Sequence, residues 1–112
     1  MTLLERQVKF AVMVAELILW AYQQKYDLTF GRAYDPPELQ EWYVKQGTGN
    51  KSSLLPLRLA VDLNLSKNGI YLTELKDYEP LGVFFESLGG SWGGRFKRPD
   101  ADHFSLSWNG VR

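Results

Sequence analysis

The sequence predicts an α+β domain in which helices pack on a small antiparallel sheet. Two segments, residues 58–65 and 103–108, alternate apolar and polar side chains with the period of two that is typical of strands. Longer segments with helical spacing precede and separate them. The chain has 112 residues, of which 45% are hydrophobic and 14% aromatic, and this is enough for one modest core. We therefore expect a single domain over residues 1–112.

The charge balance argues against nucleic acid and anionic membranes as partners. Lys and Arg total 13, Asp and Glu also total 13, and the chain has no basic cluster. The absence of cysteine excludes disulfides, thiolate metal sites and cysteine nucleophiles. Histidine occurs once, at His103, so no second imidazole is available to any site.

The first predicted element is an amphipathic helix. Thr2 and Glu5 have the spacing of a capping box, and an apolar run from Phe10 to Tyr22 follows. This run is shorter than the roughly 20 apolar residues of a membrane span, and Glu16 interrupts it. No small-residue cleavage site follows, so we expect neither a membrane span nor a signal peptide. One helical stripe is expected to face the core: Leu4, Val8, Ala11, Ala15, Leu19 and Tyr22.

A strand, a helix and a loop are expected next. Residues 28–31 (LTFG) predict a brief strand, and a helix follows with Asp35 as its N-cap, Pro36 in its first position and Gly47 at its end. Residues 47–53 are predicted to be a loop, and their Gly-x-Gly-x-Lys-Ser order resembles a phosphate-binding loop. Such a loop follows a strand and precedes a helix. Here that order is reversed, so we reject phosphate binding.

The second half of the chain supplies most of the predicted sheet. The expected elements are a strand at 58–65, a turn at 66–69, a strand at 70–72, a helix at 77–90 containing Pro80, a glycine-rich loop at 91–102 and a strand at 103–108. The two strands joined by the turn form a hairpin. Leu59, Val61, Leu63 and Leu65 share one face of the first strand, and Arg58, Ala60, Asp62 and Asn64 share the other. In the last strand, His103 lies on a face with Ser105 and Ser107.

A possible metal site follows from the polar residues of these strands. Asp62 and His103 are expected on neighbouring strands, with Asp100 and Asp102 just before the histidine. An Asp and a His that bind a metal, with a further carboxylate to activate water, are the minimal outline of a metal hydrolase. The alternative is structural: Asp62 pairs with Arg58 on the same strand face, and His103 is a structural or exposed residue. Composition and spacing leave both interpretations open.

Several motifs occur in a specific order: LTFGRAY near the N-terminus, then SLLPLRLAVDLNL, YEPLGVFFESLGG, WGGRF and DADHF. In this order and spacing they resemble peptidase family M15 over roughly residues 27–106. That family comprises zinc D-alanyl-D-alanine carboxypeptidases and L-alanyl-D-glutamate endopeptidases, the latter common among phage endolysins. The resemblance implies the family's fold, a zinc cofactor and the stem peptide of peptidoglycan as substrate.

The resemblance also implies roles for individual residues. The family pattern is Ser-x-His-x-x-(Arg or Gly)-x-Ala-x-Asp, followed later by a carboxylate three residues before a histidine. Ser53 takes the position of the family's serine, in the substrate-binding part, and Asp62 takes that of the zinc-binding aspartate. His103 matches the last zinc histidine, and Asp100 matches the carboxylate expected to act as general base.

Two positions depart from the family pattern. Leu55 stands where the first zinc histidine belongs, which leaves Asp62 and His103 as the only family ligands. Catalytic zinc normally has three protein ligands, so two should hold it far more weakly. Asp35 stands where the family has an arginine that holds a substrate carboxylate. This exchange replaces attraction by repulsion for an anionic stem peptide.

Three interpretations therefore compete. The preferred one is a degenerate, non-catalytic M15 domain that serves as a structural or cell-wall-binding module, for example in a phage or prophage particle. Its partners would be the stem peptide or phage structural proteins, and its location the host cytoplasm or the particle. The second is a working peptidase that recruits Asp100, Asp102 or a water as third ligand, an oxygen-rich set that favours harder ions than zinc. The third is that Leu55 is a deliberate inactivating change.

Overall fold

The computed structural model of the chain describes residues 1–47 and 53–112. The helices are α1 (Leu3–Gln23), α2 (Pro37–Lys45) and α3 (Leu75–Ser87), and two short 3-10 turns are η1 (Leu55–Leu57) and η2 (Gly93–Arg95). The strands are β1 (Asp27–Phe30), β2 (Ala60–Lys67), β3 (Ile70–Leu72), β4 (Ser91–Trp92) and β5 (His103–Ser105). The predicted α+β class is confirmed, because a small antiparallel sheet carries packed helices.

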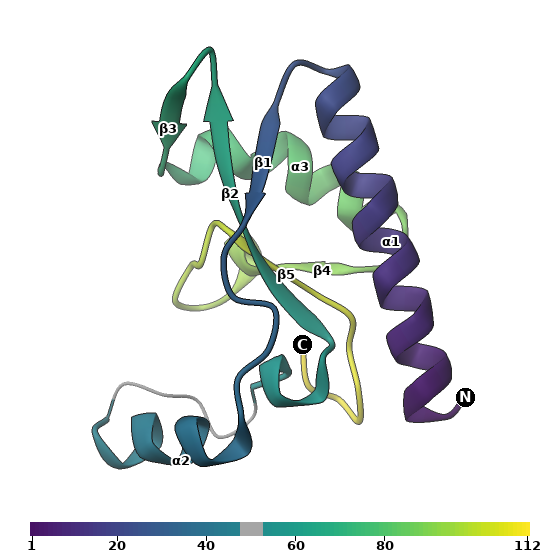
Figure 1. The fold of residues 1–112 in the computed structure, drawn as a ribbon, viewed down its shortest axis with the longest axis vertical. Coiled ribbons are helices and arrows are strands. Elements are labelled where there is room, and N and C mark those ends of the chain that lie inside the picture. Colours follow the sequence, from purple (N-terminus) through teal and green to yellow (C-terminus); the bar gives the residue numbers. More distant parts are fainter. Residues whose placement is uncertain (48–52) are drawn as a thin grey trace.

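The sheet is organised around β2, whose two halves have different neighbours (Figure 1). Its first half pairs with β5, and β4 extends the sheet beyond β5. Its second half pairs with β1 on one side and with β3 on the other. Asn68 and Gly69, both at positive φ, close the β2–β3 hairpin, as the turn signal predicts.

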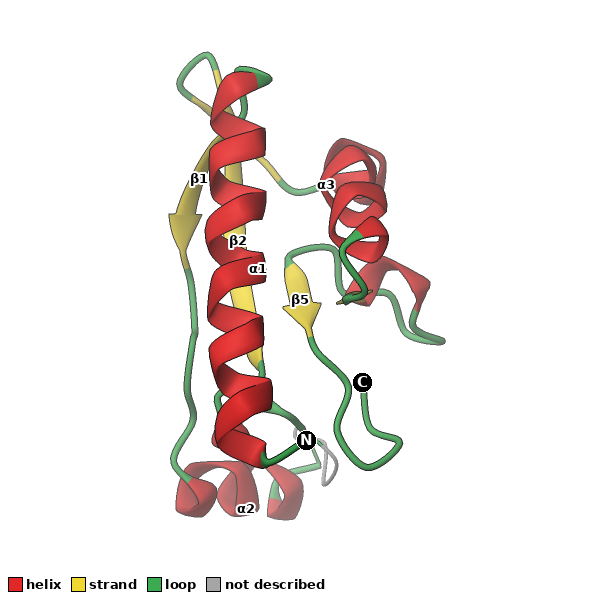
Figure 2. Ribbon diagram, turned by 90° about the vertical axis from the view of Figure 1, so that its right-hand side faces the viewer, coloured by secondary structure: helices red, strands yellow, loops and turns green. Residues whose placement is uncertain are grey.

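Helices α1 and α3 pack on the sheet and against each other (Figure 2). The ring of Phe10 from α1 meets that of Phe85 edge to face at 6.2 Å, and Trp20 stacks on Phe84 at 4.5 Å. Helix α2 lies apart from this core, beyond the end of the sheet (Figure 1). The candidate metal ligands Asp62 and His103 lie in strands of this sheet, and Asp100 lies in the loop before β5. Helices α1 and α3 support the sheet that carries them.

The predicted core stripe of α1 is wrong. Its members are exposed: Leu4 69%, Val8 57%, Leu19 64% and Tyr22 72%, with Ala11 and Ala15 also exposed. The buried face carries Phe10, Met13, Leu17 and Ala21 instead. Both sets have helical spacing, so periodicity could not distinguish them. The capping box of Thr2 and Glu5 is confirmed by both of its hydrogen bonds.

Three other boundaries differ from the prediction. Asp35 is not the N-cap of α2, because Pro36 precedes the helix without a side-chain cap and Asp35 forms an ion pair instead. The last strand ends at Ser105, and Trp108 forms an isolated bridge with Val111 outside it. Helix α3 begins before residue 77 and contains Pro80 within its length.

Part of the predicted loop at 47–53, including most of its Gly-x-Gly-x-Lys-Ser segment, lies outside the described residues. Among the residues that are described, no helix is both long and apolar enough to cross a membrane.

Candidate metal centre

Asp62 and His103 are brought together by the pairing of β2 with β5. The antiparallel register sets their Cα atoms directly opposite each other. Their neighbours Val61 and Phe104 are also paired, and both are buried in the core. Because side chains alternate between the two faces of a sheet, Asp62 and His103 share the opposite, polar face.

Asp100 joins this pair through the loop before β5. Its backbone N–H donates to the carbonyl of Gly93, and its own carbonyl accepts a hydrogen bond from the N–H of His103. A Cβ at Gly93 would lie 2.2 Å from the Asp100 carbonyl oxygen and 2.7 Å from the Cβ of His103, so only glycine fits there. The indole N–H of Trp92 fixes the same loop by donating to the carbonyl of Ala101 at 2.7 Å.

The three side chains can offer ligand atoms to one ion. One ligand atom each from Asp62, Asp100 and His103 lies within 4.8 Å of the others. The Nε2 atom of His103 is buried and, among the described residues, has no hydrogen-bond partner, as expected of a nitrogen that serves as a ligand. Two carboxylates and one imidazole fit a divalent cation, with more oxygen and less nitrogen than the family's zinc set.

Burial opposes charge on these side chains. It lowers the pKa of His103 to about 4, although the nearby Asp102 works against this shift. The imidazole is therefore neutral at pH 7, which is the state that binds metals. Burial and the charge of Asp102 raise the pKa of Asp62 to about 6 against the opposing effect of Arg32. Burial and a hydrogen bond with Asp100 raise the pKa of Asp102 to about 6.

Arg32 is a further member of the site, and no pattern in the sequence alone indicated it. Its Nε donates to Asp62 at 3.4 Å, and its NH1 donates to Asp35 at 3.0 Å. The backbone holds it there, because the Gly31 N–H donates to the Asp62 carbonyl and the Asp62 N–H donates to the Arg32 carbonyl, both at 2.7 Å. The signal for it was its place directly after the 28–31 strand, but the pairing of that strand with β2 had to be known.

The two positions that depart from the family pattern are both buried. Leu55 is 5% exposed and belongs to the apolar core. The hydroxyl of Ser53 accepts a hydrogen bond from the Leu55 N–H at 3.2 Å, so it supports the start of η1. Asp35 is 2% exposed, and its carboxylate accepts from Arg32. Its negative charge is thus partly balanced by a neighbouring guanidinium.

Arg58 is not the partner of Asp62 that the structural alternative requires. It precedes β2 with a φ of 57°, and its guanidinium lies 4.0 Å from the centre of the Tyr34 ring. The strand face that it was expected to share with Asp62 begins only at Ala60.

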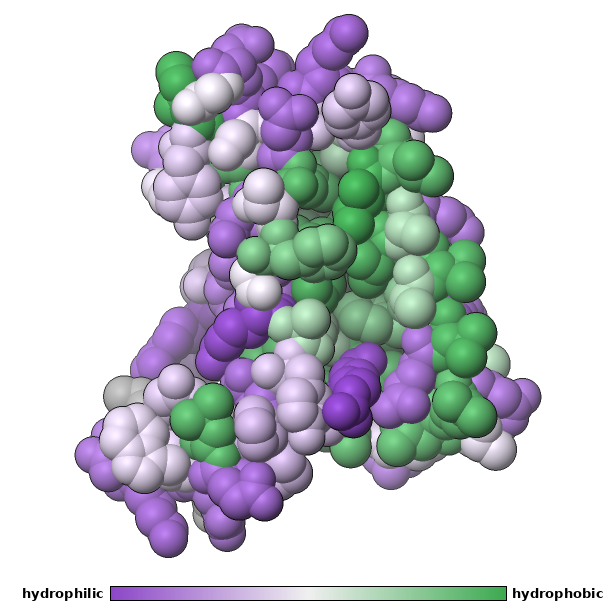
Figure 3. Space-filling model, in the orientation of Figure 1, coloured by the Kyte–Doolittle hydropathy of each residue, from purple (hydrophilic) through white to green (hydrophobic). Residues whose placement is uncertain are grey.

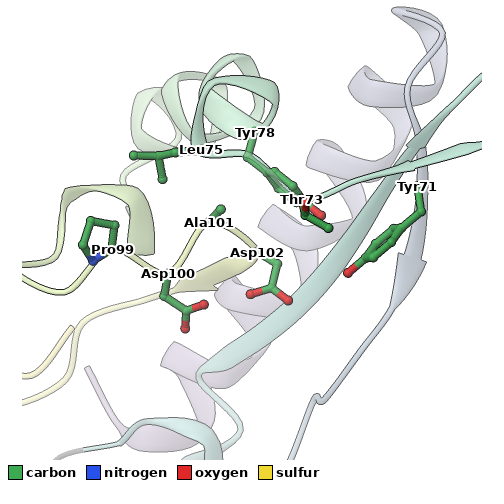
Figure 4. A pocket seen from close by; sticks show the side chains of 8 residues that line it. All are labelled: Tyr71, Thr73, Leu75, Tyr78, Pro99, Asp100, Ala101 and Asp102. Atoms are coloured by element: carbon green, nitrogen blue, oxygen red, sulfur yellow. The ribbon is translucent and has the colours of Figure 1, made fainter.

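A cavity of about 330 Å³ opens beside Asp100 (Figure 4). The residues that line it are Tyr71, Thr73, Leu75, Tyr78, Pro99, Asp100, Ala101 and Asp102. Figure 4 shows the carboxylates of Asp100 and Asp102 next to each other on one side of this space. The Tyr78 hydroxyl donates to the carbonyl of Leu72 and accepts from the N–H of Leu65, so it joins α3 to both strands of the hairpin.

Comparisons with known proteins agree with this architecture. A family model described as D-alanyl-D-alanine carboxypeptidase, of peptidase family M15, matches residues 29–106. Among solved structures, the crystal structure of the L-Ala D-Glu endopeptidase ChiX of Serratia marcescens is similar, with a TM-score of 0.67 and 22% identity. The similarity covers 81% of this chain and 75% of that one. A comparison with curated proteins gives no match.

The match over residues 29–106 includes the strands that carry Asp62 and His103, as well as the loop that carries Asp100. Together with the shared fold, it confirms the family that the sequence motifs indicate. The chain belongs to peptidase family M15.

Proposed function

We propose that this chain is an M15 domain that binds the stem peptide of peptidoglycan without hydrolysing it. The observation that carries the proposal is Leu55, a buried apolar side chain at the position of the family's first zinc histidine. A leucine has no lone pair to donate, and its apolar surroundings exclude a water that could replace one. A role in a phage or prophage particle is the setting that we propose for such a domain.

The remaining residues of the family pattern retain two zinc ligands and a general base. Asp62 and His103 would hold zinc, and Asp100 would be the general base beside it. When bound, zinc lowers the pKa of water and polarises a carbonyl group. With two of its family ligands the ion is held weakly, so this chemistry is weak or absent.

The substrate side supports binding rather than repulsion. Asp35 is paired with Arg32, so its charge is not directed unpaired at a ligand. Arg32 is about half exposed, and its NH2 group, which makes no hydrogen bond with the residues that the structure describes, can donate to a carboxylate. The cavity beside Asp100 gives a peptide side chain a place next to the carboxylates of Asp100 and Asp102. The ChiX structure is that of an L-Ala D-Glu endopeptidase, which supports a peptidoglycan stem peptide as the ligand class.

One observation favours a second candidate, a metal-dependent peptidoglycan peptidase. Asp100 lies close enough to Asp62 and His103 to serve as the third ligand in place of the missing histidine. Asp102, which shares a hydrogen bond with Asp100, is then the carboxylate left to accept a proton. Because two of the three donors are oxygens, this site would favour Mn²⁺ over Zn²⁺ more than the family's site does.

Metal analysis, sedimentation and digestion with the whole chain distinguish the two candidates. The binding domain should co-sediment with purified peptidoglycan and release no soluble fragments with Zn²⁺ or Mn²⁺ added. Arg32→Ala should then weaken co-sedimentation, while Arg98→Ala, at another exposed arginine, should leave it unchanged. Fragment release with one equivalent of Mn²⁺, lost in Asp100→Asn, would establish the peptidase instead. Absence of both binding and release would contradict both candidates.

A further inference from the structure

The outer face of α1 is an apolar surface without a partner in this structure. It consists of Leu4, Val8, Ala11, Val12, Ala15, Leu19 and Tyr22, all of which are exposed. Figure 3 shows apolar side chains along the edge of the molecule that α1 forms in Figure 1. The opposite face of the same helix already covers the core, so the outer face does not contribute to the fold.

The outer face is large for a monomer. Its exposed fractions correspond to on the order of 500–600 Å² of mainly apolar area, and monomers rarely leave a larger contiguous patch uncovered. Two such faces packed together would bury about 1,000–1,200 Å², which reaches the lower range of specific interfaces.

The residues of this face are arranged nearly symmetrically about the middle of the helix. Small side chains, Ala11 and Ala15, lie near its centre, and the large Leu4 and Tyr22 lie equally far from that centre at its two ends. Val8 and Leu19 occupy the intermediate positions. A second copy of α1 running antiparallel would therefore meet large residues with large ones and approach closely at the alanines.

The charges beside this face fit the same arrangement. Lys9 and Glu16 lie on one flank of the outer face, seven residues apart, and their midpoint lies within one residue of the centre of the apolar pattern. A two-fold axis at that point places Lys9 of each copy opposite Glu16 of the other. Within the part of the chain that the structure describes, neither residue forms an ion pair. Both are available for a partner.

We propose that the outer face of α1 binds a second copy of this chain, forming an antiparallel, two-fold symmetric helix pair centred near Val12. The apolar area, the central alanines and the crossed charges each favour this occupant over an unrelated protein, because all three are self-complementary about one point. Helix α1 is 21 residues long, about 30 Å, so the contact extends along one whole side of the domain.

Sedimentation equilibrium of the whole chain tests the proposal at micromolar concentrations, where an interface of this size should associate. The parent should be a dimer. Leu19→Glu should weaken the dimer at least about 30-fold, because it places two carboxylates in the apolar contact. Val83→Glu is the matched control, since Val83 is a similarly exposed apolar residue on α3, and it should change the dissociation constant less than about two-fold. Circular dichroism should show the parent's fold in both variants.

Charge reversal tests the antiparallel register. Lys9→Glu and Glu16→Lys should each weaken the dimer about 5-fold, because each creates two like-charge contacts. The double variant Lys9→Glu/Glu16→Lys restores the crossed pairs, so its affinity should return to within about two-fold of the parent. Single reversals without effect, or a double variant weaker than both singles, would contradict this register.

The chain contains no cysteine, so an introduced thiol can report the two-fold axis directly. Val12→Cys, at the proposed centre, should form a disulfide-linked dimer on mild oxidation, and Val83→Cys, of nearly equal exposure (49% against 52%), should not. A parent that stays monomeric throughout would overturn the proposal. So would a monomer that instead floats with phosphatidylcholine vesicles, which would assign the face to lipid.

Discussion

Asp62 and His103 are paired across the β2–β5 ladder, and burial opposes the charged form of both side chains. The pair is therefore a place where polar groups are held in a poorly solvated environment at the expense of stability. Such environments are typical of functional sites, where a bound ligand or ion can compensate for the lost solvation that Arg32 offsets only in part. In the metal-free protein, the buried pair should therefore lower the free energy of unfolding by an amount that depends on pH.

Asp62→Asn should stabilise the metal-free protein at pH 7.5 by about 1–2 kcal/mol. This is less than the free energy that corresponds to a pKa shift of about two units, because solvent screens part of the effect. The folded-state pKa of Asp62 is about 6, above its ordinary value of 3.8, so folding opposes its ionisation. This penalty is fully present above pH 6 and disappears as the pH falls below about 4. Urea unfolding in a chelator at several pH values measures it. A gain that did not shrink between pH 7 and pH 4 would contradict this explanation.

The pKa of His103 is shifted in the opposite direction, but this does not affect the comparison of Asp62→Asn with the parent. Its pKa is lowered to about 4, so it destabilises the folded state progressively as the pH falls from about 6.5 towards 4. Parent and variant share this effect, so the difference between them isolates Asp62.

Gly93→Ala should destabilise the protein by about 2–4 kcal/mol and weaken any metal binding. The new Cβ would lie 2.2 Å from the Asp100 carbonyl oxygen, which is backbone and cannot simply rotate away. The loop would have to move, and Asp100 and His103 with it. Gly110→Ala is the control, because that glycine has a φ of 79° but open space around it. The Gly110→Ala variant should lose only about 1 kcal/mol in its free energy of unfolding, and its metal affinity should match the parent's.

The sequence predicted the position of the site better than the packing of the helices. Asp62 and His103 could be placed on one sheet face because alternation and chain order determine the partners in a short antiparallel ladder. The buried face of α1 could not be chosen, because the stripes containing Leu17 and Leu19 are both apolar with the same period. The choice depends on which face meets Phe85 of α3, and this contact is distant in sequence. Arg32 was missed for the same reason, since β1 and β2 are also far apart along the chain.

Asp35→Arg, the change that restores the family's residue, should destabilise this chain by about 3–5 kcal/mol. Asp35 is 2% exposed and accepts a hydrogen bond from Arg32 at 3.0 Å. An arginine there would bury a second guanidinium beside the first with no carboxylate between them. Asp35→Asn keeps a hydrogen-bond acceptor for Arg32 and should therefore lose less stability than Asp35→Arg. Thermal unfolding of both variants measures the difference, and an arginine variant as stable as the parent would show that this segment can rearrange around it.

Leu55→His should increase zinc affinity by at least about 100-fold, because it completes the family's set of three protein ligands with Asp62 and His103. Without metal the same change should destabilise the fold, since it places an imidazole in the apolar core where Leu55 is 5% exposed. Zinc should then raise the midpoint of thermal unfolding of this variant far more than that of the parent. Leu57→His, in the same 3-10 turn, is the matched control and should gain no comparable affinity.

Competition with a chelating dye measures the affinity, and thermal unfolding with and without zinc measures the coupling. If Leu55→His bound zinc no better than Leu57→His, the geometry around Asp62 and His103 would have changed from that of the family. If the parent already bound zinc as tightly as Leu55→His, Asp100 would be the third ligand, because among the described residues it is the remaining donor within reach of the other two. Asp100→Asn in the parent background separates these outcomes, since it should abolish tight binding only in the second.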